Sequence, residues 1–528
     1  MVEIEKTRSA HVTEDHTLES LLKPYLKEDP ALLTKVKLLM ISTVDGRYRD
    51  KLERLAESYS EYSLIKRRIE IEVAYLLALE RTGIIMEKGA DGKMKPRQFT
   101  TEEVNTLESL GKGITLDQAA RIKDIEDVTK HDVKAMERGI GEFLNGTSLE
   151  SITNYVHYGL TSEDINNISY RLNLREALQD VCIPKLNELV NILITKSRQY
   201  RDVPMLARTH GQPALPTTLG KVFAEMAVNL SYDVKELEEA VSKDGFLTGK
   251  LNGAVGDLNA LAFTSPNVDW IKFSANFVRF FDLKPNLVTK QINPYRDIVK
   301  VLQIIDRING SMLDIEQDTW RYISDKWFIL TKGKGEIGSS TMPQKTNPID
   351  LETGKGSLEI ADAILSELNK SLMVTRLQRD VSDSTKMRDI GFALGRSLLA
   401  YTNVANAFKK IYPDVGKMSE ALNEDWSILT EAVQTLLRLN DVKDPYSLVK
   451  DSLPASGKIQ GKEEWVSWIN SLQIEDRFKE KLRDLTPEKY IGLSKRLTDI
   501  GMAEVLGDTE IVDSAYDWKN NAFKAIRN

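Results

Sequence analysis

The sequence is poor in the features that mark secreted, membrane-bound or nucleic-acid-binding proteins. It has one cysteine, Cys182, in 528 residues, which excludes an internal disulfide framework and favours a reducing compartment. No stretch approaches about 18 uninterrupted apolar residues, so no membrane span is expected. The N-terminal stretch MVEIEKTRSAHVTEDH is charged and lacks the apolar region of a secretory signal. The net charge is −7, whereas a general nucleic-acid binder should be basic. We therefore expect a cytoplasmic protein with neither nucleic acid nor membrane as a partner, and a small anionic substrate remains possible.

Two common kinds of catalytic centre are also missing from the sequence. There is no H-E-x-x-H motif, no pair of cysteines and no EF-hand pattern, so a metal site is poorly supported. There is no G-x-S-x-G elbow, and alternating strand patterns that would carry one are scarce. We therefore expect neither a metal centre nor a Ser-His-Asp hydrolase.

Helical periodicity is the dominant pattern that remains. No proline occurs in 295–342 or in 349–412, and apolar residues recur there at steps of three and four. Within 390–408 the only charged residue is Arg396, which predicts a helix buried on several sides. The expected core stripes are Val222, Met226, Leu230, Val234, Leu237 and Val241; then Leu302, Ile305, Ile308, Met312, Ile315, Thr319 and Tyr322; then Met387, Ile390, Leu394, Leu398, Tyr401, Ala405, Phe408 and Ile411. Long helices of this kind predict an all-α fold with a central bundle that extends across subunits.

The order of these patterns along the chain suggests a domain organisation. A helical pattern runs from Glu53 to Leu79, and the segment Glu87–Gln98 has no periodicity and is predicted to be a surface loop. The residues just before position 333 also read as helical. The predicted parts are a polar N-terminal extension (1–35), an N-terminal helical domain (36–150), a central long-helix domain (151–410) and a C-terminal helical domain (411–528).

A glycine-rich loop, GKGEIGSSTMPQKTNP, ends at Pro348 and is the most unusual stretch of the chain. Gly333, Gly335 and Gly338 match the dinucleotide-binding string G-x-G-x-x-G, but no helix can start before Pro348. The P-loop pattern fails as well, because Ser339 stands where its lysine must be. Exposed amides, two adjacent hydroxyls and one lysine predict a loop that holds an anion or stabilises developing negative charge.

Histidine is scarce, and three of the five histidines stand in unusual surroundings. His131 precedes an aspartate in TKHDVKAME, His157 lies in NYVHYGLTSEDINN, and His210 lies in the Gly/Pro-rich LARTHGQPALPTT, which predicts a loop. An unperturbed histidine titrates near neutrality and is suited to donating a proton. The alternative for each is a hydrogen-bonding or surface histidine, and His157 fits a core position. His11 and His16 lie in the N-terminal extension and are expected to be inert.

Two further polar clusters could bind an anion. Arg379, Ser384 and Arg388 stand at the start of the charge-poor helix, where two guanidiniums and a hydroxyl would suit a phosphate or a carboxylate. A solvated helix start with surface ion pairs is the alternative. Thr161 and Ser162 precede two acidic residues and predict a helix N-terminus, whose free hydroxyls and amides could also hold an anion.

Together these stretches resemble one family. The sequence GSSTMPQKTNP resembles the signature loop of the fumarase/aspartase superfamily, whose members eliminate fumarate from succinyl-type substrates. Over roughly residues 40 to 500 the chain resembles the bacterial type of the adenylosuccinate lyase family. The stretches that carry this closer resemblance are VDGRY (44–48), KHDVKA (130–135), TSEDINN (161–167), RTHGQPA (208–214), NGAVGD (252–257) and QRDVSDSTKMR (378–388).

The resemblance implies an all-helical fold of three domains in a homotetramer whose active sites are shared between subunits. It implies β-elimination of fumarate from adenylosuccinate, which gives AMP, and from the succinyl-carboxamide ribotide of purine synthesis. It implies no metal and no organic cofactor. Ser339 would be the general base and His210 the general acid, and Lys345 would stabilise the charged intermediate. A serine hydroxyl is a poor base, so it would need loop amides and a nearby cation.

The remaining roles are also carried over from matching positions. His131 and Asp132 would orient the substrate and the general acid. The residues implied to hold the succinyl carboxylates are Thr161, Ser162, Gln291, Ser340 and Asn347. The residues implied to hold the nucleotide phosphate and ribose, or to bind substrate beside them, are Arg47, Tyr48, Lys130, Arg379, Ser384 and Arg388.

Two positions depart from the family pattern. Gln344 stands where these enzymes often have histidine, and the string MPQK is usual in argininosuccinate lyases. Thr353 stands where a family asparagine contacts the nucleotide. Argininosuccinate lyase is therefore the main alternative, followed by fumarase or aspartase and by a catalytically inactive structural relative. The phosphate-type cluster at 379–388 favours the nucleotide substrate, and intact Ser339, His210 and Lys345 favour an active enzyme.

Overall fold

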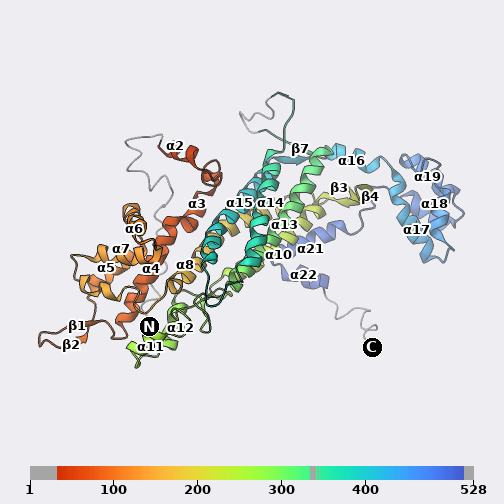
Figure 1. Cartoon of the computed structure of the whole chain (residues 1–528). Helices are drawn as coiled ribbons and strands as arrows, with labels where there is room; N and C mark the ends of the chain where they lie inside the picture. Colours follow the sequence, from red (N-terminus) through yellow and green to blue (C-terminus); the bar gives the residue numbers. More distant parts are fainter. Residues whose placement is uncertain (1–31, 333–340, 343, 517–528) are drawn as a thin grey trace, which may run out of the picture. The chain divides into compact units, whose positions relative to one another are not determined.

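The computed structural model describes residues 32–332, 341–342 and 344–516, and these residues are mostly helical (Figure 1). The β-strands of the described residues form four two-stranded sheets. The predicted mainly helical fold is therefore confirmed. The chain separates into two compact units by its internal contacts. The first comprises the described residues of 1–185, 235–309 and 356–402, and the second those of 186–234, 310–355 and 403–528.

The first unit begins with short amphipathic helices gathered around α4 (Figure 1). Its N-terminal elements are α2 (Leu32–Leu39), α3 (Arg49–Tyr59), α4 (Glu61–Glu80), β1 (Met86–Lys88), β2 (Met94–Pro96), α5 (Thr101–Lys112), α6 (Leu116–Thr129), α7 (Asp132–Leu144), the 3-10 helix η1 (Glu150–Tyr155), α8 (Ser162–Ala177) and the π-turn η2 (Leu178–Cys182). The helix predicted from Glu53 to Leu79 is two helices, because the Ser60 hydroxyl accepts from the backbone N–H of Ser63 and caps a new start.

The segment Glu87–Gln98 is a small antiparallel hairpin rather than the predicted irregular loop. Strands β1 and β2 pair from Met86 opposite Pro96 to Lys88 opposite Met94. Gly92 has a φ of 80°, which a glycine adopts without strain. Each strand is only three residues long, so no alternation could reveal it in the sequence.

The remaining elements of the first unit lie later in the chain. They are β5 (Thr248–Gly249), α11 (Asn259–Thr264), α12 (Trp270–Phe280), β6 (Lys284–Pro285) and the portions of the long helices α13 (Arg296–Ser324), α14 (Ile349–Ser371) and α15 (Ser382–Lys410) that fall in its ranges. Strands β5 and β6 form a parallel pair, with Thr248 opposite Lys284.

The long helices confirm the predicted stripes. On α15, every stripe residue from Met387 to Phe408 is buried, and so are Leu399, Val404 and Ala407 on other faces. Burial on several sides agrees with the near absence of charge within 390–408 of this helix. Residues 222–241 and 302–322 likewise fall in α10 (Leu219–Val241) and α13, with most of their stripe residues buried.

The second unit contains the β3–β4 hairpin and the C-terminal helices. Its elements, besides portions of the long helices, include α9 (Ile183–Gln199), β3 (Pro204–Thr209), β4 (Gln212–Thr218), β7 (Phe328–Leu330), β8 (Ile411–Pro413), α16 (Val415–Asn423), the 3-10 helix η3 (Trp426–Leu429), α17 (Thr430–Leu439), α18 (Pro445–Ser452), α19 (Gly461–Ser471), α20 (Asp476–Arg483), α21 (Ser494–Leu506) and α22 (Thr509–Tyr516). The residues before position 333, which read as helical, form the short strand β7 instead, paired with β8.

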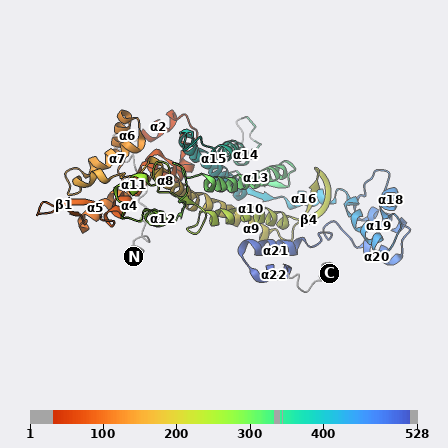
Figure 2. The same ribbon diagram turned by 60° about the horizontal axis from the view of Figure 1, so that its bottom comes forward.

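Two packing features organise the second unit. Helix α21 lies along α10, where Gly501 approaches Ala224 closely (Figure 2). Residues from Trp426 to Leu482 form their own hydrophobic core around Trp465, in the group of small helices α17 to α20. The predicted division into domains at residues 150 and 410 stays a prediction. No helix in the described part of the chain is long and apolar enough to cross a membrane.

Candidate active site

The predicted site residues fall in both units. His210, Lys345 and Asn347 belong to the second unit, and the other described residues belong to the first. Ser339 and Ser340 lie outside the described residues. Each group is therefore considered within its own unit. No group of three or more histidine, cysteine, aspartate or glutamate side chains within 32–332, 341–342 and 344–516 is arranged to hold a metal ion.

His210 lies on a loop, as predicted, and that loop is the tip of the β3–β4 hairpin, whose strands were not predicted. Thr209 pairs with Gln212, so His210 and Gly211 form a two-residue turn. Both have positive φ angles, 53° and 72°, as a type I′ turn requires. The sequence did not predict this hairpin, because β4 contains prolines and proline is uncommon inside a sheet. The imidazole of His210 is exposed.

The neighbouring Arg208 stabilises the base of this turn within the second unit. Its Nη1 donates to the Gly211 carbonyl at 3.4 Å, and its guanidinium stacks over the Trp327 ring at 5.2 Å. Asp325 lies 3.7 Å from the Arg208 Nε. Charge and stacking thus fix Arg208, while His210 stays available to a ligand.

Lys345 is exposed and Asn347 half-buried, immediately before α14. Helix α14 begins at Ile349, directly after Pro348, where the sequence predicted that a helix could first start. The Pro348 carbonyl accepts from Leu351 N at 3.0 Å, so the proline begins the helical hydrogen bonding without needing an N–H of its own. Gln344 is also exposed.

In the first unit, Lys130 and His131 connect α6 to α7. Lys130 closes α6 in a left-handed conformation with a φ of 54°, and its side chain is exposed. His131 caps α7: its Nδ1 accepts from the backbone N–H of Lys134 at 3.2 Å. The half-exposed imidazole therefore has Nδ1 occupied as an acceptor and presents Nε2 to a ligand.

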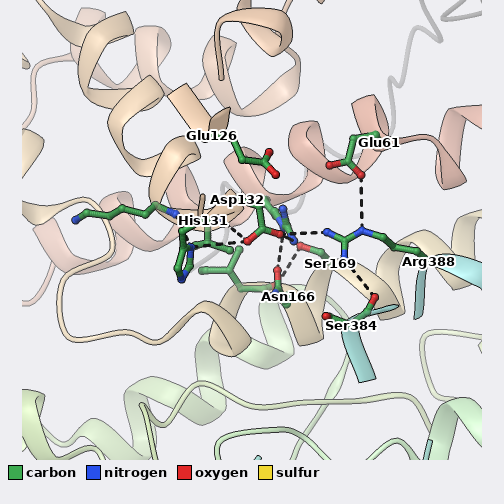
Figure 3. A network of polar contacts seen from close by, with 12 residues as sticks. Glu61, Glu126, His131, Asp132, Asn166, Ser169, Ser384 and Arg388 are labelled. Carbon is green, nitrogen blue, oxygen red and sulfur yellow. Dashed lines mark hydrogen bonds and ion pairs between the residues drawn. The ribbon is translucent and has the colours of Figure 1, made fainter. Parts of the chain in front are cut away.

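Asp132 lies between two arginines from different helices (Figure 3). Its Oδ2 accepts from Arg68 Nη2 on α4 at 2.7 Å and from Arg388 Nη2 on α15 at 3.3 Å. Burial alone would raise the pKa of Asp132, but the charge of Arg68, the Val133 N–H and the charge of Arg388 outweigh it, so the pKa lies below its usual value. The carboxylate is therefore ionised near neutral pH.

The predicted anion cluster at 379–388 joins the same network. Arg388 Nη1 donates to the Ser384 carbonyl at 3.3 Å, and Ser384 is half-buried (Figure 3). Arg379 points into the unit instead, with Nη2 3.0 Å from Glu163 Oε1 and 3.5 Å from Asp383 Oδ1. Both guanidiniums thus face carboxylates, which corrects the picture of a simple solvated helix start.

Thr161 and Ser162 begin α8, as predicted, and a buried carboxylate holds their turn. Asp164 Oδ2 accepts from Thr161 N at 2.9 Å, and Asp164 Oδ1 accepts from Asn252 N at 2.9 Å. Lys250 Nζ lies 3.0 Å from the same Oδ1, and both side chains are fully buried. The TSEDINN and NGAVGD stretches therefore form one rigid turn assembly, with the hydroxyls of Thr161 and Ser162 only half-buried.

Gln291 and the Arg47–Tyr48 pair lie at other edges of the first unit. Gln291 is half-buried in a bend before α13, two residues ahead of Asn293, whose amide donates to Thr248 Oγ1 at 3.2 Å. The Tyr48 ring receives the guanidiniums of Arg47 and Arg396, each 5.9 Å from its centroid. Arg396, the only charged residue within 390–408, thus anchors the VDGRY stretch, which its isolation in the sequence could have suggested.

Sequence reasoning missed that the site rests on buried polar residues. Arg68, Glu163, Asn166 and Lys250 stand in polar stretches that gave no sign of burial, and only the folded chain shows their partners. His157, for which a core position was an alternative, is mostly buried and its Nδ1 lies 2.6 Å from Glu72 Oε1. Burial would lower the pKa of His157, but the Glu72 charge raises it above its usual value.

Comparisons with known proteins identify the family. The lyase family model matches residues 46–360, and the adenylosuccinate lyase C-terminal model matches residues 375–491. The chain is 37% identical to the adenylosuccinate lyase of Haemophilus influenzae, over 88% of this chain and 98% of that protein. It is 36% identical to those of Escherichia coli K12 (88% and 98%) and Dictyostelium discoideum (86% and 97%).

Solved structures share the fold at much lower sequence identity. The 3-carboxy-cis,cis-muconate lactonizing enzyme of Pseudomonas putida is 19% identical, with a TM-score of 0.67 over 86% of this chain and 97% of that one. A fumarate lyase from Mesorhizobium is 17% identical, with a TM-score of 0.68 over 85% and 97%. The full-length similarity and the shared fold agree with the resemblance seen in the sequence motifs. The chain belongs to the adenylosuccinate lyase family of the fumarase/aspartase superfamily.

Proposed function

We propose that the chain eliminates fumarate from adenylosuccinate, giving AMP, and from the succinyl-carboxamide ribotide of purine synthesis. The observation that carries this proposal is 37% identity to an adenylosuccinate lyase over 98% of that protein's length. The arginine-rich network around Asp132 supports it, because a nucleotide phosphate needs guanidinium partners that can form two hydrogen bonds at once.

In the proposed reaction, Ser339 removes the proton from the carbon β to the leaving nitrogen, and His210 protonates that nitrogen. The hairpin tip suits His210 to this role, because its imidazole is exposed and its backbone is held by the turn. Lys345 would stabilise the negative charge that develops on the succinyl carboxylate after proton removal. No metal or organic cofactor is required for this chemistry.

The substrate carboxylates would be bound by half-buried polar groups that rigid turns present. Thr161 and Ser162 are held by the Asp164 assembly, and fixed donors cost little reorganisation during the reaction. Gln291, Ser340 and Asn347 would complete this set.

The nucleotide would be bound mainly from α15 and the VDGRY stretch. Arg388 is 42% exposed although it contacts Asp132, so part of its guanidinium remains open to a phosphate. Asp132 and the imidazole of His131 would orient the substrate and the general acid. The other proposed partners of the phosphate and ribose are Arg47, Tyr48, Lys130, Arg379 and Ser384.

The direct test of the proposed roles uses two substitutions. We expect Ser339→Ala and His210→Ala each to lower kcat by on the order of a hundredfold or more, because each removes a general acid or base. Fumarate release from adenylosuccinate, without added metal and with a chelator present, measures both. Near-normal kcat in either variant would remove that residue from its role. Activity that disappears with the chelator and returns with a metal would contradict the cofactor-free reaction.

We also propose that the chain forms a cytoplasmic homotetramer with active sites shared between subunits. Exposed large apolar side chains on the long helices, such as Tyr232, Trp320 and Ile360, are the kind of surface that subunit contacts bury. Mixing Ser339→Ala protein with His210→Ala protein should restore some activity if the sites are shared. Absence of recovery after confirmed subunit exchange would contradict sharing.

Argininosuccinate is the alternative substrate, favoured by the MPQK string around the exposed Gln344. An argininosuccinate lyase would need no nucleotide phosphate site, so substituting the arginines should affect the reaction of only one of the two substrates. Loss of Arg388 should weaken adenylosuccinate binding strongly and leave an argininosuccinate reaction unaffected.

A further inference from the structure

Arg68 is a fully buried arginine that connects two helices of the first unit. Its side chain on α4 is 2% exposed. Nη2 donates to Asp132 Oδ2 at the start of α7 at 2.7 Å, and Nε donates to Asn166 Oδ1 on α8 at 2.8 Å. A lysine offers a single charged nitrogen in place of this fixed fork and cannot hold both partners in the same geometry.

The two arginines that contact Asp132 differ in exposure. Arg68 is buried and its nitrogens are committed to protein partners, whereas Arg388 is 42% exposed and approaches the same Oδ2 at 3.3 Å. Figure 3 shows Asp132 and Arg388 facing one another, with His131 beside the aspartate. One guanidinium therefore fixes the carboxylate, and the other can be placed by that carboxylate for a ligand.

We propose that Arg68 is a positioning residue for the substrate site: it holds Asp132 so that the carboxylate aligns Arg388 for the nucleotide substrate. This inference rests on the proposed function, because it assumes that Arg388 meets the nucleotide. Arg68 itself touches no substrate and acts only through Asp132.

The surroundings of Asp132 make this role visible in a pH profile. Arg68 faces it from α4, Arg388 from α15 and Tyr170 from α8, and His131 lies 3.8 Å away on its own helix start. Glu61 on α4 faces both arginines. Burial would raise the pKa of Asp132, and the Arg68 charge is the strongest influence that lowers it. Loss of Arg68 therefore raises this pKa, and the acid limb of kcat/KM moves to higher pH.

The experiment compares Arg68→Gln with Arg67→Gln, the adjacent position on the same helix. Arg67 is also largely buried, and it pairs with Glu70 at 2.6 Å, with Glu176 and with Asn173, away from Asp132. We measure KM and kcat for adenylosuccinate across pH, with unfolding by urea as a check on stability. We expect Arg68→Gln to raise KM about tenfold, which is the lower end of the loss seen when a residue that orients a binding group is removed. We also expect the acid limb of the kcat/KM profile to move to higher pH.

The control and a conservative variant separate positioning from stability. Arg67→Gln should leave KM and the acid limb unchanged even where it lowers stability. Arg68→Lys keeps the charge, so it should leave the acid limb near its original pH while KM rises by an intermediate amount, and it replaces Arg68→Gln if that variant does not fold. Unchanged KM and pH profile in Arg68→Gln, or equal changes in Arg67→Gln, would overturn the inference while leaving the proposed function intact. Wild-type protein that releases no fumarate from adenylosuccinate would overturn both.

Discussion

Replacing Lys250 with methionine should destabilise the first unit more than any surface substitution would. Lys250 and Asp164 are fully buried, and Lys250 Nζ lies 3.0 Å from Asp164 Oδ1 and donates to the Gly253 carbonyl at 3.0 Å. Methionine keeps much of the side-chain volume but removes the charge. The Asp164 carboxylate then stays buried without a counter-charge, and the Gly253 carbonyl loses a donor.

The magnitude follows from the groups that remain. Breaking a buried ion pair by removing one partner costs about 3–5 kcal/mol. Asp164 still accepts from the backbone N–H groups of Thr161, Asn252 and Gly253, which continue to solvate its charge. We therefore expect the lower end, a loss of about 3 kcal/mol in the free energy of unfolding.

Urea denaturation followed by circular dichroism measures this loss, at one protein concentration because an oligomer's stability depends on concentration. Lys243→Met, at an exposed lysine of the same unit, is the matched control. It removes the same charge at the surface, so it should change the free energy of unfolding by less than about 0.5 kcal/mol. A loss below about 1 kcal/mol in Lys250→Met, or an equal loss in Lys243→Met, would refute the reasoning.

Two further predictions concern backbone and charge. Gly211→Ala should destabilise the protein by about 1 kcal/mol, because the φ of 72° is strained for alanine although its Cβ would meet no neighbour. Gly310→Ala, inside helix α13 and equally open, should stabilise the protein by up to about 1 kcal/mol. Urea midpoints that order the two variants oppositely would contradict this account. The raised pKa of His157 beside Glu72 means that the folded state favours the protonated imidazole. The pair therefore adds to the free energy of unfolding. This stabilisation is fully present below the unfolded pKa of about 6.5 and is lost as pH rises through the higher folded pKa. The stability difference between wild type and His157→Gln should therefore shrink from pH 6 towards about pH 9, and a difference that does not change over this range would contradict the pairing.

The sequence predicted well whatever depends on local periodicity. The stripe on α15 emerged from apolar spacing and from the scarcity of charge, and both are properties of neighbouring residues. The helix start after Pro348 also followed from local chemistry, because proline cannot sit further inside a helix without breaking a hydrogen bond.

The elements that were missed depend on long-range or very short-range geometry. The hairpin at His210 was hidden because prolines and a glycine read as an irregular loop, although two successive positive φ angles made a tight turn. The carboxylates that pair with Arg68 and Lys250, Asp132 and Asp164, lie 64 and 86 residues away along the chain, so no spacing rule could connect them. Most site residues named from the family resemblance lie within the described units, Ser339 and Ser340 lie outside the described residues, and the roles of all of them stay predictions.

The most direct measurement of the central claim is the rate of fumarate release from adenylosuccinate and from argininosuccinate, with the same purified protein under the same conditions. We predict turnover of adenylosuccinate with AMP as the second product, and kcat/KM for argininosuccinate lower by orders of magnitude. The arginines proposed to bind the phosphate would be left without their partner when the nucleotide is absent. Turnover of argininosuccinate without turnover of adenylosuccinate would contradict the substrate assignment, and turnover of neither would contradict the proposed activity.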